Sequence, residues 1–337
     1  MKITLLAIDI AKNVFHCHGV DQKGKVLLKK KVQRKQLLSY IANLASCTIV
    51  METCSGANYW YREFKKLGHE VKLISPKLVK PYVKTNKNDY NDAEAIAEAA
   101  SRDSMRFVSA KTIEQQDIQS LHRIRTNLIQ SRTALVNQMR GLLAEYGVIV
   151  PQGIRHIRNK ISDILEDAKN DLTMLTREII ADLYEQLCLL DQSIVGYDKR
   201  IENIFNKNEA CQRLAKIEGI GILTATALVA SIGNPHLFKN GRHCAAWLGL
   251  VPKQKSSGGK QCLLGISKRG NTYIRTLLIS GARSVLRFVD KKTEDKYNWI
   301  KSIKARRGSH KAGVALANRN ARIAWALLAS GEKYSFA

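Results

Sequence analysis

Short apolar runs alternate with longer amphipathic stretches over about the first hundred residues. The apolar or alternating runs have the length of strands and cover residues 3–8, 13–20, 25–32, 48–51 and 70–74. The amphipathic stretches have the length of helices and cover residues 34–45, 58–67 and 89–101. Between the second and third runs, Asp21-Gln-Lys-Gly24 is typical of a hairpin turn. The predicted order is β-β-β-α-β-α-β-α.

This order favours a ribonuclease-H-like α/β domain over a doubly wound dinucleotide-binding domain. Three strands joined by tight turns come first, and strands linked by helices follow. The motif Gly-x-Gly-x-x-Gly, which makes the phosphate-binding turn of the doubly wound fold, does not follow the first strand.

The middle of the chain carries two longer helical patterns. Residues 114–146 repeat apolar positions in helical steps, and Pro151-Gln-Gly153 then interrupts the chain. A second stripe runs from Ile161 to Ile204 in steps of three and four, which predicts a long helix or coiled-coil arm, broken near residue 170. We expect the stripe to be buried against another helix, in the same chain or in a partner subunit, and we favour the partner.

The net charge of +26, from 55 Lys and Arg against 29 Asp and Glu, indicates a polyanionic partner, with nucleic acid as the first candidate. Residues 211–337 hold 23 of the basic and 5 of the acidic residues (+18), whereas residues 1–210 hold 32 and 24 (+8). A basic surface kept for solubility is the alternative. With 45% hydrophobic residues, wholesale disorder is not expected.

Several classes of protein are not predicted. No apolar run reaches the length of a membrane helix, and Asp9 and Lys12 interrupt the apolar start, so we expect no signal peptide and no membrane partner. The seven cysteines form no Cys-x-x-Cys pair and are typical of reduced thiols in a cytoplasmic protein. The cluster around His16 lacks a second ligand pair, so zinc is not predicted.

Four acidic residues fall at the ends of predicted elements. Asp9 and Glu52 follow the first and fourth strands, and Asp89 and Asp92 share one face at the start of a helix. Converging carboxylates repel one another unless a cation lies between them, and oxygen ligands favour Mg²⁺ or Mn²⁺. The pattern therefore predicts a two-metal site for phosphoryl transfer. For each acid alone, a turn residue or helix cap is the alternative.

The C-terminal third contains a predicted helix-hairpin-helix at residues 214–229. Gly219 and Gly221 permit a tight turn, and the amides that begin the second helix can hold a phosphate. A plain turn between two helices is the alternative.

A glycine-rich basic segment at residues 249–260 comes next. It lacks the first Gly and the final Ser or Thr of a P-loop. Ser256 and Ser257 stand beside two glycines, but no activating base is adjacent, so from spacing alone we favour a flexible phosphate-binding loop over a nucleophile. Basic residues here and in later turns predict contacts with phosphate, with a solvated charged face as the alternative: Lys253, Lys255, Lys260, Lys268, Arg269, Arg275, Arg306 and Arg307.

In their order along the chain, seven motifs resemble those of the transposases of insertion-sequence family one-ten, the bridge-RNA-guided DNA recombinases. They do not separate its main branch from its eleven-eleven branch. The motifs are AIDIAK (7–12), METCSG (51–56), KNDYNDA (87–93), IEGIG (217–221), AWLGLVP (246–252), SSGG (256–259) and ISKRG (266–270).

The resemblance implies three parts. Residues 1–150 would form a RuvC-like domain, with a core at 1–105 and the helix at 114–146. Residues 151–210 would form a coiled-coil dimerisation arm. Residues 211–337 would form a mainly α-helical transposase domain with the helix-hairpin-helix and a catalytic serine loop.

The resemblance also implies the site and the partners. Asp9, Glu52, Asp89 and Asp92 match the family's D-E-D-D metal site, and Ser257, with Ser256 in reserve, matches the serine that joins a DNA 5′ phosphate. The metal site and the serine would come from different subunits of a tetramer, and a bridge RNA would pair with donor and target DNA. Such a protein is bacterial or archaeal and associates with the nucleoid. Asn88 stands where the family often has Thr, just downstream of Thr85.

Two other functions remain open. A structure-specific nuclease, such as a junction resolvase, would use the same acids with water as the nucleophile. A nucleic-acid-binding protein without catalysis would need none of them.

Overall fold

The computed structural model describes residues 2–84 and 88–334 and divides into two compact units, Met1–Thr112 and Ile113–Ala337. Lys87 of the third motif and Thr85 lie outside the described residues. We expected the helix at 114–146 to belong with residues 1–150; in the structure it lies in the second unit, where it packs against three helices of that unit. None of the helices in the described ranges combines the length and apolar content that a bilayer span requires.

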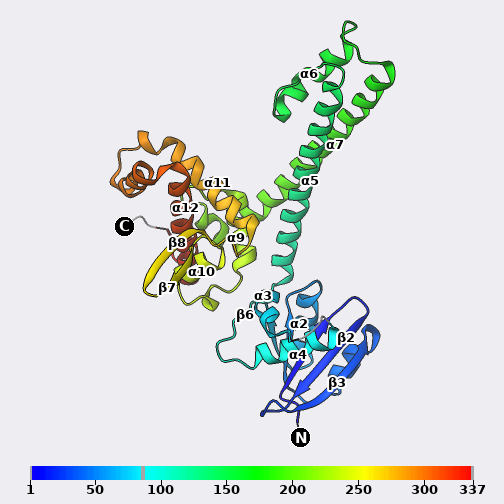
Figure 1. Cartoon of the computed structure of the whole chain (residues 1–337), viewed down its shortest axis with the longest axis vertical. Coiled ribbons are helices and arrows are strands. Elements are labelled where there is room, and N and C mark those ends of the chain that lie inside the picture. Colours follow the sequence, from blue (N-terminus) through cyan, green and yellow to red (C-terminus); the bar gives the residue numbers. More distant parts are fainter. Residues whose placement is uncertain (1, 85–87, 335–337) are drawn as a thin grey trace. The chain divides into compact units, whose positions relative to one another are not determined.

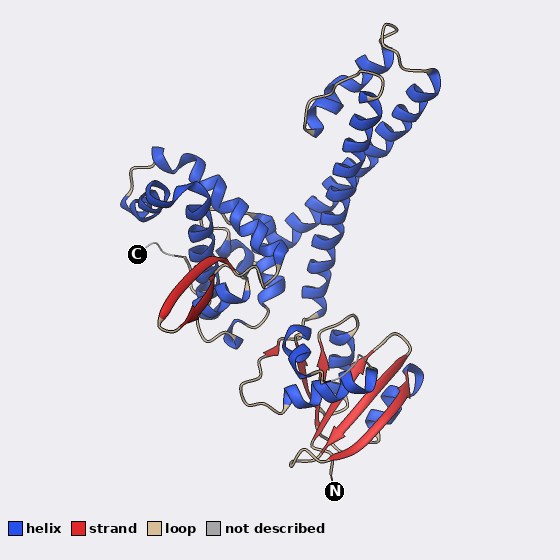
Figure 2. Cartoon of the chain, in the orientation of Figure 1, coloured by secondary structure: helices blue, strands red, loops and turns tan. Residues whose placement is uncertain are grey.

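The first unit is built on a six-stranded sheet with the order β3-β2-β1-β4-β5-β6 (Figures 1 and 2). The strands β1 to β3 are antiparallel, and β1, β4 and β5 are parallel, as a ribonuclease-H-like order requires. The strands are β1 (Leu5–Ile10), β2 (Val14–Val20), β3 (Val26–Gln33), β4 (Thr48–Glu52), β5 (Glu70–Ile74) and β6 (Phe107–Val108). The sequence did not predict β6, because it has only two residues.

Helices cover both faces of this sheet. They are α1 (Leu37–Ala42), α2 (Ala57–Lys66), α3 (Pro76–Val79) and α4 (Asp89–Ala100). Successive strand residues face opposite sides. In β1, Leu6 and Ile8 enter the core that α2 covers, whereas Ala7 enters the core that α4 covers. Asp9 is two residues after Ala7 and lies on the same face of the sheet, so it faces α4.

The second unit begins with an arm of three helices, α5 (Ile113–Ala144), α6 (Ile154–Glu166) and α7 (Met174–Lys207). Arg125 in α5 forms an ion pair with Asp198 in α7, and Arg132 forms one with Asp191 at 3.0 Å. A step of seven residues forward in α5 thus matches a step of seven back in α7. The two helices are therefore antiparallel, with the heptad spacing of a coiled coil.

The arm buries most of its apolar stripe within one chain, against α5 and α6, and burial of the rest by a partner subunit stays a prediction. One core joins α5 to the stripe. It contains Leu135 and Met139 of α5, Leu172 and Leu187 of the stripe, and the neighbouring Ile180. The chain reverses between Glu166 and Met174, near the predicted break, so α5 lies close enough to cover the stripe.

The rest of the second unit is a helical domain with one hairpin. Its elements are α8 (Glu209–Leu214), α9 (Ile222–Ile232), α10 (Gly241–Trp247), β7 (Pro252–Ser257), β8 (Lys260–Ile266), α11 (Thr272–Phe288) and α12 (Asn298–Ser330). The core gathers apolar residues from α8 to α12. Gly281 of α11 lies so close to the turn before α9 that an added Cβ would lie 1.8 Å from the Gly219 carbonyl oxygen. That contact anchors the predicted helix-hairpin-helix turn on α11.

Candidate active site

Three of the four predicted acids meet between β1 and α4. Carboxylate oxygens of Asp9, Asp89 and Asp92 lie within 4.8 Å of one another. Asp89 and Asp92 occupy the first turn of α4, and Asn88 caps that helix by accepting a hydrogen bond from the Tyr90 amide at 3.0 Å. Acidic residues are favourable at a helix start. The capped helix therefore directs both of its acids toward β1.

Glu52 lies beside this cluster but outside the 4.8 Å group. It ends β4, directly after Met51, which pairs with Ile8 in the parallel register. Val50 enters the α4-side core, so alternation places Glu52 on the same face as Asp9. Both carboxylates raise the pKa of the Cys54 thiol, after the larger effect of burial. Glu52 therefore faces the same site, and both it and Asp9 lie near the Cys54 thiol.

The cluster is electrostatically costly as an isolated set of anions. Burial raises the pKa of Asp9, and the charges of Asp92 and Asp89 raise it further, whereas His16 lowers it. A cation among these oxygens would remove the repulsion. The all-oxygen donor set fits a hard divalent cation.

His16 is part of this site, although the sequence pattern did not place it there. It pairs with Asp9 in the β1–β2 register and is 5% exposed. Its Nδ1 atom lies 3.6 Å from Asp89 Oδ2 and makes no hydrogen bond within the described residues. Its ring packs edge-on against Tyr90, with centroids 4.6 Å apart. The sequence feature that could have indicated this is the alternation along β2. It puts His16 on the other face of the sheet from Phe15 and Cys17, which are buried in the core under α2.

The predicted serine loop is a β-hairpin rather than an irregular loop. Strands β7 and β8 pair around Gly258 and Gly259, whose φ angles of 55° and 77° suit a tight type I′ turn. Ser257 pairs with Lys260, and Ser256 pairs with Gln261. Both serines are exposed.

The predicted nucleic-acid contacts divide into exposed and buried residues. The exposed ones are Gly221, Lys253, Lys255, Lys260, Lys268, Arg269, Arg306 and Arg307. Gly219 is half-buried against α11. Arg275 is 6% exposed and donates to the carbonyl oxygens of Leu248, at 3.1 Å, and Gly270, at 3.4 Å. Its guanidinium thus holds together the chain around the hairpin, and its role as a nucleic-acid contact stays a prediction.

Comparison with known proteins matches both units. A family model for DEDD transposases, described as "Transposase", matches residues 6–148, and one described as "Transposase IS116/IS110/IS902 family" matches residues 211–298. The chain is 50% identical to the transposase for insertion sequence element IS1111A of Coxiella burnetii, over 98% of this chain and 91% of that protein.

Two further relatives extend over nearly the full chain. A probable family 20 transposase of Pseudomonas aeruginosa is 44% identical over 97% of both chains. The transposase for insertion sequence element IS1328 of Yersinia enterocolitica is 38% identical over 99% of both chains. The match to the DEDD model also implies that the first unit has the RuvC-like fold predicted from the order of its elements.

Proposed function

The chain belongs to the IS110/IS116/IS902 family of insertion-sequence transposases, and from this premise we propose that it cuts and rejoins donor and target DNA through a covalent serine–DNA intermediate. The observation that carries the proposal is the convergence of Asp9, Asp89 and Asp92 on one point, with Glu52 facing it. Such a cluster serves phosphoryl transfer when a divalent cation is bound.

Asp9, Glu52, Asp89 and Asp92 would hold Mg²⁺ or Mn²⁺. The bound metal supplies Lewis-acid stabilisation of charge on the phosphate oxygens. His16 of β2 lies next to Asp9 in the sheet, and its Nδ1 atom lies 3.6 Å from Asp89 Oδ2.

Ser257 is the proposed nucleophile. Its Oγ would form a bond to the phosphorus of a DNA 5′ phosphate while the bond from phosphorus to the 3′ oxygen breaks. The serine proton passes in net terms to that 3′ oxygen, which becomes a free hydroxyl. Because a serine–phosphate ester replaces the DNA ester that was broken, a 3′ hydroxyl from another strand can attack the same phosphorus and release Ser257. Lys255 and Lys260 flank Ser257 on the hairpin and would neutralise the phosphate.

The assembly follows from the same proposal. We propose that subunits associate through the arm into a dimer and then a tetramer, in which the metal site and the serine that act together come from different subunits. The arm leaves Leu175 65% exposed and Leu189 56% exposed, although its main stripe is buried in cis. A bridge RNA that pairs with both DNAs accounts for a net charge of +26 better than DNA alone.

A metal-dependent nuclease is the second candidate, because the acid cluster alone would also serve a water nucleophile. The two are separated by incubating the protein with Mg²⁺, the bridge RNA and end-labelled DNA carrying the insertion-sequence junction. A band of labelled DNA that migrates with the protein after denaturation supports the serine mechanism. Cleaved DNA without such a band supports the nuclease, and neither product supports a binding protein without catalysis.

A further inference from the structure

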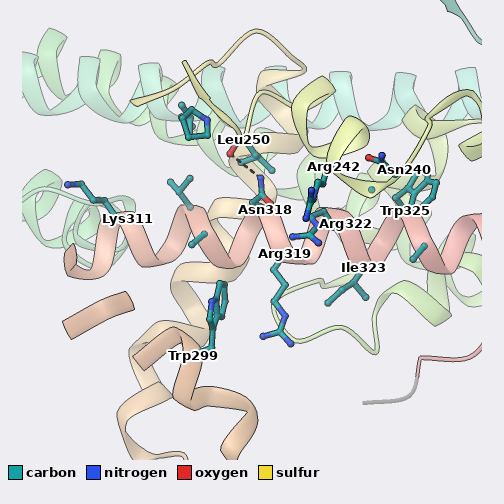
Figure 3. A pocket seen from close by; sticks show the side chains of 16 residues that line it. Asn240, Arg242, Leu250, Trp299, Lys311, Asn318, Arg319, Arg322, Ile323 and Trp325 are labelled. Carbon is teal, nitrogen blue, oxygen red and sulfur yellow. Dashed lines mark hydrogen bonds between the residues drawn. The ribbon is translucent and has the colours of Figure 1, made fainter. Parts of the chain in front are cut away.

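A cationic groove of about 1180 Å³ runs along α12 (Figure 3). The start of α10 and both ends of the β7–β8 hairpin complete its lining. An added Cβ on Gly241 would lie 3.1 Å from the Arg322 carbonyl oxygen, so α10 lies directly on α12 there. This close approach brings Arg242 and Arg322 into one wall of the groove, although they are 80 positions apart in the sequence.

The groove is strongly positive. Arg242, Lys311, Arg319 and Arg322 line it, and none of its lining residues in the described part of the chain is acidic. Arg242, Lys311 and Arg322 are exposed and form no ion pair among the described residues. Cations gathered in a concave surface without acidic partners concentrate the positive potential and favour a polyanion.

An aromatic platform stands in the same groove. Gly308 (φ 79°) kinks α12, so that its first segment folds back and Trp299 meets Arg319. The Arg319 guanidinium lies 5.2 Å from the centre of the Trp299 ring, and the indole remains 41% exposed. An indole beside a guanidinium suits an unpaired base, because every base offers a flat face for stacking.

The groove leads to the serine hairpin. Pro252 begins β7 and Ile266 ends β8, and both line the groove. Asn318 of α12 donates a hydrogen bond to the Leu250 carbonyl oxygen at 3.2 Å, two residues before the hairpin. The base of the hairpin is thereby tied to the helix that carries the cations.

We propose that this groove binds an unpaired stretch of nucleic acid, with its phosphates against the four cations and one base against Trp299, and leads that strand to the hairpin. The proposal rests on the proposed function, since it names the strand that reaches Ser257. The ligand chemistry is a flexible phosphodiester chain with exposed bases. Unpaired DNA at a recombination site and an unpaired loop of an RNA both supply it. A paired duplex offers phosphates but no free base face.

The test measures binding of fluorescein-labelled probes to the full chain by anisotropy. It uses the Ser257→Ala protein, so that covalent capture plays no part. The probes are a 20-nucleotide DNA strand, the RNA of the same sequence and the blunt DNA duplex, each measured over a range of salt. We expect Trp299→Ala to weaken binding of a single strand by about 5- to 150-fold and that of the duplex by less than about twofold. Trp299→Phe should retain most of the affinity.

Charge removal provides the second measurement. The variant R242Q/R319Q/R322Q should lower the slope of log affinity against log salt by about 2 for single strands. The control K160Q/K199Q/K207Q removes three exposed charges from the arm and should leave Trp299-dependent binding unchanged. The probe with the higher affinity, DNA or RNA, identifies the source of the strand.

Three results would overturn the groove proposal: an equal loss for duplex and single strand, an unchanged affinity in Trp299→Ala, or an equal loss in the arm control. Thermal unfolding of each variant identifies any that fail to fold, and if Trp299→Ala is one of them, the charge variant R242Q/R319Q/R322Q carries the test. Adduct formation by the unsubstituted protein is scored separately. A missing adduct with intact groove binding refutes the serine mechanism alone.

Discussion

Ser256 and Ser257 are consecutive in β7 but project from opposite faces of the hairpin. Ser256 shares its face with Gln254, whose side-chain amide donates to Ser256 Oγ at 2.8 Å. Ser257 shares the other face with Lys255 and pairs across the hairpin with Lys260. The two hydroxyls therefore face different surroundings, one amide and one cationic, and the cationic face stabilises a phosphate more strongly.

This difference predicts which serine is joined to DNA. Ser257→Ala should reduce the covalent adduct by more than about a thousandfold, because no hydroxyl remains on the cationic face. Ser256→Ala should keep the adduct within about threefold, since it loses only the contact with Gln254. The adduct is measured on denaturing gels with end-labelled DNA. The reverse order of effects would assign the nucleophile to Ser256.

Asp9 gives a prediction about the metal. Its pKa is raised by burial and by the charges of Asp92 and Asp89, so its ionised form destabilises the metal-free protein at neutral pH. Asp9→Asn should therefore raise the melting temperature without metal. It should also abolish the stabilisation by Mg²⁺ or Mn²⁺, which is about 3 kcal/mol for the unsubstituted protein at a hundred times the dissociation constant. Calorimetry with and without metal checks both effects.

The matched control for Asp9 is Asp103→Asn, an exposed acid in the same unit and outside the cluster. It should leave the metal-induced stabilisation intact. If Asp9→Asn retained that stabilisation while Asp103→Asn lost it, the metal would bind elsewhere.

Local patterns predicted the first unit well, because its strands and helices are each specified by neighbouring residues. Alternation along β1 and β4 was sufficient to place Asp9 and Glu52 at one edge. It did not place His16, because its role depends on pairing with Asp9 across the sheet, and only the register shows that.

Tertiary packing decided what the sequence missed in the second unit. The stripe of α7 is the same whether α5 of its own chain or a partner covers it, so only the fold could choose. The groove cations Arg319 and Arg322 lie one helical step apart, but Arg242 joins them only because α10 packs on α12. Arg275 belongs to a basic stretch in the sequence, yet its burial follows from the carbonyl oxygens around it.

The contrast between Arg275 and Arg269 predicts two separate phenotypes. Arg275→Gln should destabilise the protein by about 1–3 kcal/mol, because buried carbonyl oxygens lose charged donors. Arg269→Gln, at an exposed position, should change stability by less than about 0.5 kcal/mol and lower the salt slope of nucleic-acid binding by about 1. Urea unfolding and anisotropy titrations measure the two effects. A fully stable Arg275→Gln protein with weakened binding would establish Arg275 as a contact residue.

His122 predicts how acid affects the junction between the arm and the helical domain. It is 3% exposed in α5, and its ring nitrogens lie 2.8 Å from the Tyr273 hydroxyl of α11 and 3.0 Å from the Thr226 hydroxyl of α9. Thr226 donates its proton to the Ile222 carbonyl oxygen, so His122 Nε2 donates to Thr226 and Nδ1 accepts from Tyr273. The neutral ring is thus the form that fits.

Burial, with a smaller effect from Arg125, lowers the pKa of His122 from 6.5 to about 4. The unfolded chain therefore binds a proton that the folded chain does not bind between these values, and stability falls as the pH drops from about 6.5 toward 4. The loss at pH 4 is about 3 kcal/mol. His122→Gln does not titrate and should remove this dependence, as measured by urea unfolding at several pH values. Exposed His156→Gln should keep it, and an unchanged slope in His122→Gln would place the acid sensitivity in another group.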